Sequence, residues 1–464
     1  MAGGISLSHV RDEARTRLWP LPVVALVLAV ALGIGLPRLD AAIDDDLPGW
    51  LTVYLFGGGA SAARTILGTI ATSLISVTSL TFSLTVVTLQ LASSQFSPRL
   101  LRTFTRDRFV HVTLALFLAS FVYALTVLRT VRTAEERGTP FVPQLAVTLA
   151  FMLAIASVLG LVLFLAHLTR DIRVETILRN VHQDATGTIE NVLRSRSEPA
   201  VGPSPPRRPA DGVVALVAPE SGFLIGLDGA RLCAAARDVD AVVVIEVPVG
   251  SALVANTPLG VAWSRSSEGL GDDDRARLQR GVARGLQTGF ERTSREDVGF
   301  GMRQLVDVAI RALSPSLNDP TTAAYALNHS AALLCELLGR ELDPRVVSDE
   351  EDTPRVVQTQ YSFADLLELA ISQPRHYGSA DPLVADALLD LLNKVAWVAD
   401  DPADLDAIES QLARLRAALD RHPFDEEQRT ALRAREEAVS TTLTRPRRTQ
   451  HHDDPRPQES AGAG

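Results

Sequence analysis

Residues 64–100 read RTILGTIATSLISVTSLTFSLTVVTLQLASSQFSPRL, and this stretch decides the fold class. No charged side chain occurs from Thr65 to Ala92, a segment longer than the about 20 apolar residues that cross a bilayer as a helix. A helix is favoured there because it bonds its backbone groups within its own segment, where water is absent. The stretch therefore predicts a long transmembrane helix over residues 65–92.

Hydroxyl side chains recur at helical spacing along this span. One stripe consists of Thr65, Thr69, Thr72, Ser76, Ser79 and Ser83, and it reaches Gln90 two turns later. A second, adjacent row consists of Thr78, Thr81, Thr85 and Thr88. A lipid-facing helix gains little from hydroxyls, although each of them can bond the carbonyl four residues earlier. We therefore expect the stripe to face protein or water.

Two interpretations of the stripe remain open. In the first, small residues such as Gly68 and Ala71 allow close packing of helices, and the hydroxyls form interhelical hydrogen bonds. In the second, several subunits place the stripe around an aqueous path, where hydroxyls replace part of an ion's hydration shell. The span then continues into the cytoplasm, where Gln95, Arg99 and Arg102 form a positive mouth that favours anions.

Three further spans without acidic or basic side chains are predicted at Trp19–Leu36, Phe109–Leu128 and Val142–Leu168. A cleaved signal peptide is the alternative for the first of them. Arginines precede the first span, crowd the link between the second and third, and follow the fourth, and positively charged loops stay inside. The sequence therefore predicts a multi-pass protein of the bacterial inner membrane, surrounded by the lipid bilayer, with both termini in the cytoplasm.

The chain beyond the fourth span predicts a cytoplasmic α+β region. The predicted divisions are a four-helix transmembrane domain (1–169), a helical stalk (170–195), a linker (196–212), a small β-rich module (213–270), a helical domain (271–443) and a disordered tail (444–464). The strings APESGFL and IEVPVGSALVANTPLGVAW in the β-rich module resemble the barrel-sandwich fold of biotinyl and lipoyl carriers. Those carriers attach their group to a lysine, which this segment lacks, so we expect a small barrel or sandwich with a structural or docking role.

Polar residues around SPSLNDP, residues 314–320, form the candidate contact site of the helical domain. Asn318 or Asp319 is expected to cap the helix that follows, with Pro320 in its first turn. Side chains from both sides of this turn are predicted to converge on a ligand or a subunit contact: Asp297, Arg303, Gln304, Asp307, Asn318, Asp319 and Thr322.

Two long strings carry a family resemblance: SLTFSLTVVTLQLASSQFSPRLLRTFTRD and VGFGMRQLVDVAIRALSPSLNDPTTA. Together with the β-rich segment they resemble the bacterial predicted membrane proteins grouped as domain of unknown function 2254. The resemblance runs from the first span to about residue 420. It implies a multi-pass inner-membrane protein, and it supplies no activity and no functional residues.

Composition and motifs narrow the classes of function. With 45 Lys and Arg against 55 Asp and Glu, the formal net charge is −10, which argues against a nucleic-acid partner. Cys233 and Cys335 are far apart in sequence, so neither a disulfide framework nor a metal site is predicted, and no cofactor is expected. The sequence contains no Walker loop, HExxH, CxxC or GxSxG motif, so we do not expect an enzyme.

The predicted function is therefore an oligomeric channel or transporter-like protein, a homo-oligomer in which the second span lines an ion path. The alternative is a membrane-anchored scaffold or sensor whose cytoplasmic domain binds a protein partner.

Overall fold

The computed structural model describes residues 20–43, 55–95, 107–132, 141–171, 173–196, 203–266 and 269–445, with backbone only at 43, 91–95 and 171. Predictions about Arg99, Arg102 and the tail beyond residue 445 lie outside these residues, as does the side chain of Gln95. The chain divides into two compact units, an N-terminal unit (Met1–Ile177) and a C-terminal unit (Leu178–Gly464).

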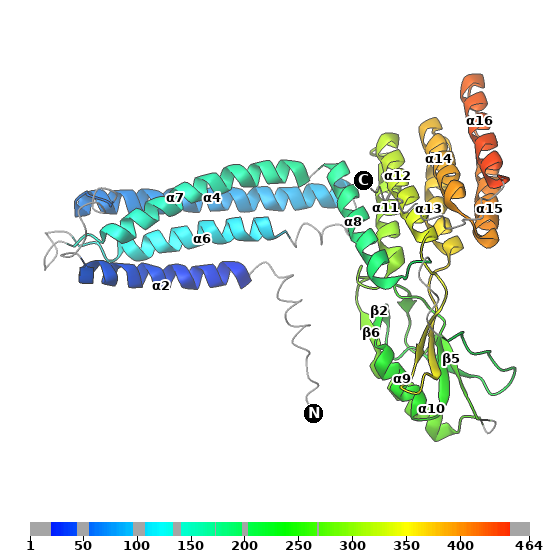
Figure 1. Ribbon diagram of the computed structural model, residues 1–464. Helices are drawn as coiled ribbons and strands as arrows, with labels where there is room; N and C mark the ends of the chain where they lie inside the picture. The colour runs from blue at the N-terminus through cyan, green and yellow to red at the C-terminus, as the bar shows by residue number, and fades with distance from the viewer. Residues whose placement is uncertain are drawn as a thin grey trace, which may run out of the picture. The chain divides into compact units, whose positions relative to one another are not determined.

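Four long apolar helices build the N-terminal unit: α2 (Pro20–Ile43), α4 (Ala60–Gln95), α6 (Arg108–Leu128) and α7 (Gln144–Asp171) (Figure 1). Each is long and apolar enough to cross a membrane, which agrees with the four predicted spans. α2 continues beyond the predicted end of the first span, because Arg38 and Asp40 are helical. α4 is longer than predicted at both ends.

Helix α6 lies at the centre of this unit and packs against α2, α4 and α7 (Figure 1). Half of the residues in its apolar window are buried, against 17% in each of the other three helices. The seam uses small residues: Gly160 of α7 lies beside Leu116 and Phe117 of α6, where an added Cβ would be tight. Most residues in the apolar windows of α2, α4 and α7 are therefore not buried by the rest of the chain.

Polar side chains tie the helices together inside this bundle. The buried Asp40 carboxylate of α2 accepts the backbone N–H groups of Leu145 and Ala146, both at 3.1 Å, and so caps the start of α7. Tyr123 of α6 is fully buried and donates its hydroxyl to the Ala146 carbonyl at 3.0 Å. Asp40 therefore lies inside the bundle, although it is an acidic residue.

The described part of the C-terminal unit contains two β-sheets, of which the larger is mixed and the smaller is antiparallel. The five-stranded sheet has the order β1 (Val214–Val217), β5 (Pro258–Ser264), β3 (Ala241–Ile245), β8 (Pro354–Gln358), β7 (Arg345–Ser348). Only β3 and β8 pair in parallel among the described strands. The three-stranded sheet has the order β4 (Ala252–Leu253), β2 (Gly222–Leu227), β6 (Leu286–Gly289).

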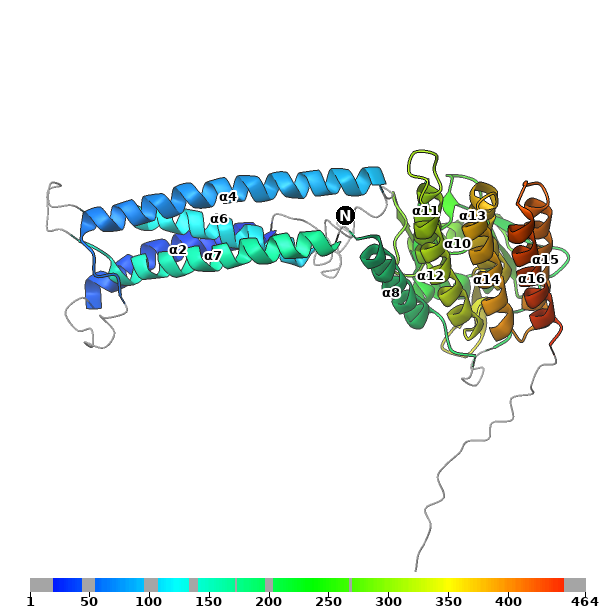
Figure 2. The same cartoon turned by 90° about the horizontal axis from the view of Figure 1, so that it is seen from above.

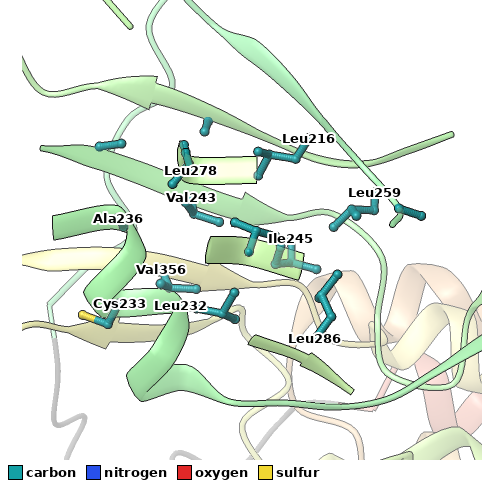
Figure 3. Packing of buried hydrophobic residues seen from close by; sticks show 14 of the residues in the cluster. Leu216, Leu232, Cys233, Ala236, Val243, Ile245, Leu259, Leu278, Leu286 and Val356 are labelled. Carbon is teal, nitrogen blue, oxygen red and sulfur yellow. The ribbon is translucent and has the colours of Figure 1, made fainter. Parts of the chain in front are cut away.

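Apolar side chains from both sheets meet helices α9 (Gly229–Arg237) and α10 (Asp272–Gly285) in one core (Figure 3). The strands contribute Val243, Ile245 and Val356, whereas Leu232 comes from α9 and Leu278 from α10. All five are at most 1% exposed. Burial of these side chains in one cluster is the main apolar contribution that holds strands far apart in sequence together.

The described strands form no closed barrel, so the resemblance to a barrel-sandwich carrier fold is not confirmed. The predicted division at residue 270 also cuts through this architecture. β6, β7 and β8 come from the region predicted to be a helical domain, and they complete both sheets. Each is only four or five residues long, which is why helical periodicity around them dominated the prediction.

The remaining helices form three stacked helical hairpins. These are α11 (Val298–Ala312) with α12 (Pro320–Leu338), α13 (Phe363–Gly378) with α14 (Pro382–Val398), and α15 (Pro402–Leu419) with α16 (Glu426–Leu443). α11, α13 and α15 lie in one row, and α12, α14 and α16 lie in the other (Figure 2). Asp319 caps α12 with Pro320 in its first turn, as the sequence predicts.

Helix α8 (Val174–Val192) follows the fourth span, where a helical stalk is predicted. Most of it belongs to the C-terminal unit. Ala185 lies against Gly301 of α11, so closely that a Cβ at Gly301 would overlap it. Thr186 donates to Glu336 of α12 at 2.9 Å. This part of α8 is thus packed against the helical hairpins, and it is not a free-standing rod.

Candidate functional site

The predicted stripe on α4 points away from the rest of its unit. Every member is exposed: Thr65, Thr69, Thr72, Ser76, Ser79, Ser83 and Gln90. The buried side chains of α4 are Ala63, Leu67, Ala71, Leu74, Thr81 and Thr88. At about 3.6 residues per turn, these two sets lie about half a turn apart around the helix. The stripe is therefore opposite the seam that packs on the neighbouring helices.

Several hydroxyls of α4 donate hydrogen bonds within their own helix. Thr65, Thr69 and Ser76 donate to the carbonyls of the residues four before them, at 2.8–3.1 Å. The second row does the same, for example Thr81 to the Val77 carbonyl at 2.8 Å. Because the hydroxyl proton is used in this way, an exposed hydroxyl presents oxygen lone pairs outward. A row of outward oxygen atoms suits water or a cation better than an anion.

The structure does not bring the predicted polar residues of the C-terminal unit into one site. Asp297 directly precedes α11, whereas Asn318 and Asp319 lie in the turn after its end and Thr322 lies in the first turn of α12. These groups are separated by the length of α11, about 22 Å for its 15 residues. The predicted convergence is therefore wrong for Asp297.

The turn residues do meet one another. Asp319 accepts the backbone N–H of Thr322 at 3.0 Å and its hydroxyl at 2.6 Å, which is the helix cap and not a ligand site. Asn318 is exposed, with a left-handed φ of 47° that Asn tolerates. Their contacts are those of a structural turn.

The other three residues of the predicted contact site lie along α11: Arg303, Gln304 and Asp307. Arg303 donates to Gln373 of α13 at 3.2 Å, Gln304 is buried, and Asp307 is half-buried. Arg303 thus links two helices of the same row. None of these three contributes a side chain to the cavity described below.

Asp297 has a partner that sequence reasoning missed. Its two carboxylate oxygens accept from Arg292 Nε at 2.7 Å and Nη2 at 2.9 Å, and the carboxylate is almost wholly buried. Burial raises the pKa of Asp297, and the charge and hydrogen bonds of Arg292 oppose that rise. Gly250, with φ of 94°, approaches so closely that a Cβ there would overlap this carboxylate. Gly250 leaves the space that the Asp297 carboxylate occupies, and only the structure shows that these two residues meet.

A cavity of about 380 Å³ lies beside the Arg292–Asp297 pair. The neighbours of Asp297, Glu296 and Val298, line it, together with residues from the end of α8 and the segment after β8. Its volume is within the range of sites for small molecules. The charged side chains around it are Arg295, Glu296 and Arg345.

One lining residue of this cavity carries a buried polar atom without a protein partner. The side-chain oxygen of Gln360 is buried and makes no hydrogen bond with the described residues. A buried polar atom without a partner costs about 1–3 kcal/mol, so a bound donor would be stabilised there. Burial, followed by the charge of Asp297, raises the pKa of the adjacent Tyr361, which keeps its hydroxyl protonated. The cavity therefore offers charges of both signs.

The sequence of the chain matches a family model described as "Predicted membrane protein (DUF2254)" over residues 15–394. The chain belongs to this family. The DUF2254 match includes both the α4 stripe and every residue that lines the cavity. Uncharacterized proteins of Mycobacterium bovis and Mycobacterium tuberculosis are 36% identical to the chain over 443 residues, which is 94% of this chain and 82% of each relative. No solved structure matches it.

Proposed function

We propose that this DUF2254 protein is a homo-oligomeric channel of the bacterial inner membrane, with the stripe of α4 lining an ion path between subunits. Both termini face the cytoplasm in this arrangement. The observation that carries the proposal is the exposure of every stripe residue, opposite the seam by which α4 packs in its own chain.

The exposed stripe needs an environment that one copy does not supply. In a single chain embedded in lipid, the outward oxygens of Thr65, Thr69 and Ser76 would face hydrocarbon. Copies that turn this face toward one another place the oxygens around a common axis, where they substitute for hydration water. From Thr65 to Gln90 the stripe is about 37 Å long, which exceeds a hydrocarbon core of about 30 Å.

The direction of the hydroxyl bonds argues for cations. Thr65, Thr69 and Ser76 donate their hydroxyl protons to backbone carbonyls, so their oxygens face the path as acceptors. This differs from the anion preference predicted from Arg99 and Arg102, which lie outside the described residues. The reversal potential in a KCl gradient across a planar bilayer decides between the two signs of charge.

Ion flux through purified full-length protein in liposomes tests the channel itself. The double variant Ser76→Leu, Ser79→Leu replaces two stripe hydroxyls by apolar groups, and we expect its current to fall to that of empty liposomes. Ser73→Leu is the matched control, because Ser73 is exposed on the same helix but lies at the side of the stripe. Equal currents in all three proteins, or none in the wild type, would count against the channel.

A second candidate function is a membrane-anchored sensor of a small zwitterion, and the unpartnered Gln360 oxygen favours it. An ammonium group would donate to this oxygen and to Glu296, whereas a carboxylate would face Arg295 or Arg345. α-Amino acids carry both groups and are small enough for the cavity.

Thermal unfolding of the full chain in detergent tests the sensor, with each of the common α-amino acids added at millimolar concentration. We expect at least one to raise the Tm of the wild type, and not that of Gln360→Leu. Gln428→Leu, in the cap of α16 outside the cavity, is the control for loss of a glutamine. No shift with any amino acid would count against this function and would leave the flux result unaffected.

A further inference from the structure

A second hollow in the C-terminal unit gathers positive side chains. It has a volume of about 620 Å³ and lies where the ends of α13 and α15 meet. Its basic lining residues are Arg375, His376, Arg421 and His422. None of the described residues that line it is acidic, in a chain whose formal net charge is −10.

Arg375 is held in place by a neutral partner. Its Nη1 donates to the side-chain oxygen of Gln411 at 2.6 Å, and Gln411 is 5% exposed. The amide of Gln411 in turn donates to Glu368. The guanidinium is therefore fixed in orientation by a buried amide, and its remaining donors are not used by this bond.

The nearby carboxylate of Glu368 is already engaged. It accepts from Gln411 and from Arg414, the latter at 2.8 Å. Burial alone would raise the pKa of Glu368, but these hydrogen bonds, one from Ser372 and the charges of Arg414 and Arg375 lower it overall. The negative charge of Glu368 is thus shared among several partners and does not line the hollow.

The clustering carries an electrostatic cost. Burial lowers the pKa of Arg375, and the positive charges of Arg414 and Arg421 lower it further against the opposing effect of Glu368. The negative ends of the α13 and α15 dipoles explain why single cations are stable there. These dipoles alone do not explain why two arginines and two histidines lie in one hollow.

The second arginine and a histidine complete the hollow from the other hairpin. Arg421 is exposed and follows α15. The described residues give its guanidinium no hydrogen bond to a carboxylate. The His422 ring meets the buried Ser379 hydroxyl at 3.1 Å, which fixes the ring at the rim. An anion in the hollow would therefore meet donors from two hairpins.

We infer that this hollow binds a phosphorylated anion, with Arg375 and Arg421 as its principal charged donors. Planar guanidinium groups pair with phosphate oxygens through two parallel N–H donors, and clustered arginines are the usual protein partners of phosphate groups. The source is either a soluble phosphate compound or the headgroup of an anionic lipid, because both present the same oxygens.

Calorimetric titration of inorganic pyrophosphate into the full chain, held in nanodiscs of phosphatidylcholine alone, tests the inference. We expect Arg421→Gln to weaken binding about tenfold or more, since it removes a charge-assisted contact. Arg421→Lys should restore part of the affinity. Arg421 is exposed, so these variants leave the fold intact, which unchanged Tm values verify.

The matched control is Arg433→Gln, which removes the same charge from an exposed position of α16 outside the hollow. Loss of affinity in Arg421→Gln alone supports a site. Equal affinity in the wild type and Arg421→Gln, or an equal loss in Arg433→Gln, overturns it. Undetectable binding of pyrophosphate at millimolar concentration also overturns it.

The same titration separates the two sources of the anion. Nanodiscs that contain phosphatidic acid should weaken pyrophosphate binding to the wild type if the headgroup occupies the hollow. Unchanged binding assigns the hollow to a soluble phosphate compound. The flux experiment is independent of either result, because it depends on α4 alone.

Discussion

The two rows of hydroxyls on α4 have the same chemistry and opposite surroundings. Thr81 and Thr88 are buried against neighbouring helices, whereas the stripe that includes Thr69 and Ser76 is exposed. Members of both rows donate their hydroxyl protons to carbonyls of their own helix. Polar content therefore does not distinguish a packing row from a free row. Only the neighbours of the helix do so, and none of them packs against the exposed row as they pack against Thr81 and Thr88.

Removal of an inward polar group should have the largest effect on stability. Asp40→Ala leaves the N–H groups of Leu145 and Ala146 without their buried acceptor. We expect a loss of about 2–3 kcal/mol in the free energy of unfolding, measured in mixed detergent micelles. Asp40→Asn keeps one acceptor oxygen and should lose less. An unchanged midpoint for Asp40→Ala would show that this cap contributes nothing.

The buried row of α4 should resist larger side chains. Thr81 is fully buried, so Thr81→Leu forces extra volume into the seam, and we expect a loss of about 1–3 kcal/mol. Thr72→Leu makes the same change on the exposed stripe and provides the control. If both variants unfold at the same detergent concentration, the assignment of the two faces is wrong.

A smaller effect is expected where a single neutral hydrogen bond is lost. Tyr123→Phe removes the hydroxyl that bonds the Ala146 carbonyl and retains the ring, so the expected loss is about 1 kcal/mol. Tyr325→Phe, at a position 46% exposed, should cost less, as measured by the same unfolding curve. A larger loss for Tyr325→Phe would contradict the ranking by burial.

The exposed stripe should have the smallest effect on the stability of the single chain. The double variant Ser76→Leu, Ser79→Leu should change the free energy of unfolding by no more than about 0.5 kcal/mol, since both positions are exposed. Unfolding at protein dilutions where cross-linking detects only monomer gives this value. A loss comparable to that of Thr81→Leu would mean that the stripe packs within the chain.

The sequence was sufficient for the four spans and for the hydroxyl stripe, because apolar length and helical spacing are local properties. The face on which the stripe lies depends on α6, which periodicity within α4 cannot show. The cap by Asp319 followed from neighbouring residues, whereas the Arg292–Asp297 pair required the approach of Gly250 from another loop. The cavity at Gln360 likewise joins segments far apart in the chain.

The parallel pairing of β3 with β8 has a consequence for the way the chain is made. Residues 246–353 separate these two strands, and they include α10, α11 and α12. During synthesis β3 therefore leaves the ribosome with one edge unpaired until β8 follows, and an open strand edge is prone to pair with other chains. A fragment that stops at residue 270 would keep that edge permanently. We expect such a fragment to aggregate, and this half of the protein to fold only when its synthesis has passed residue 358.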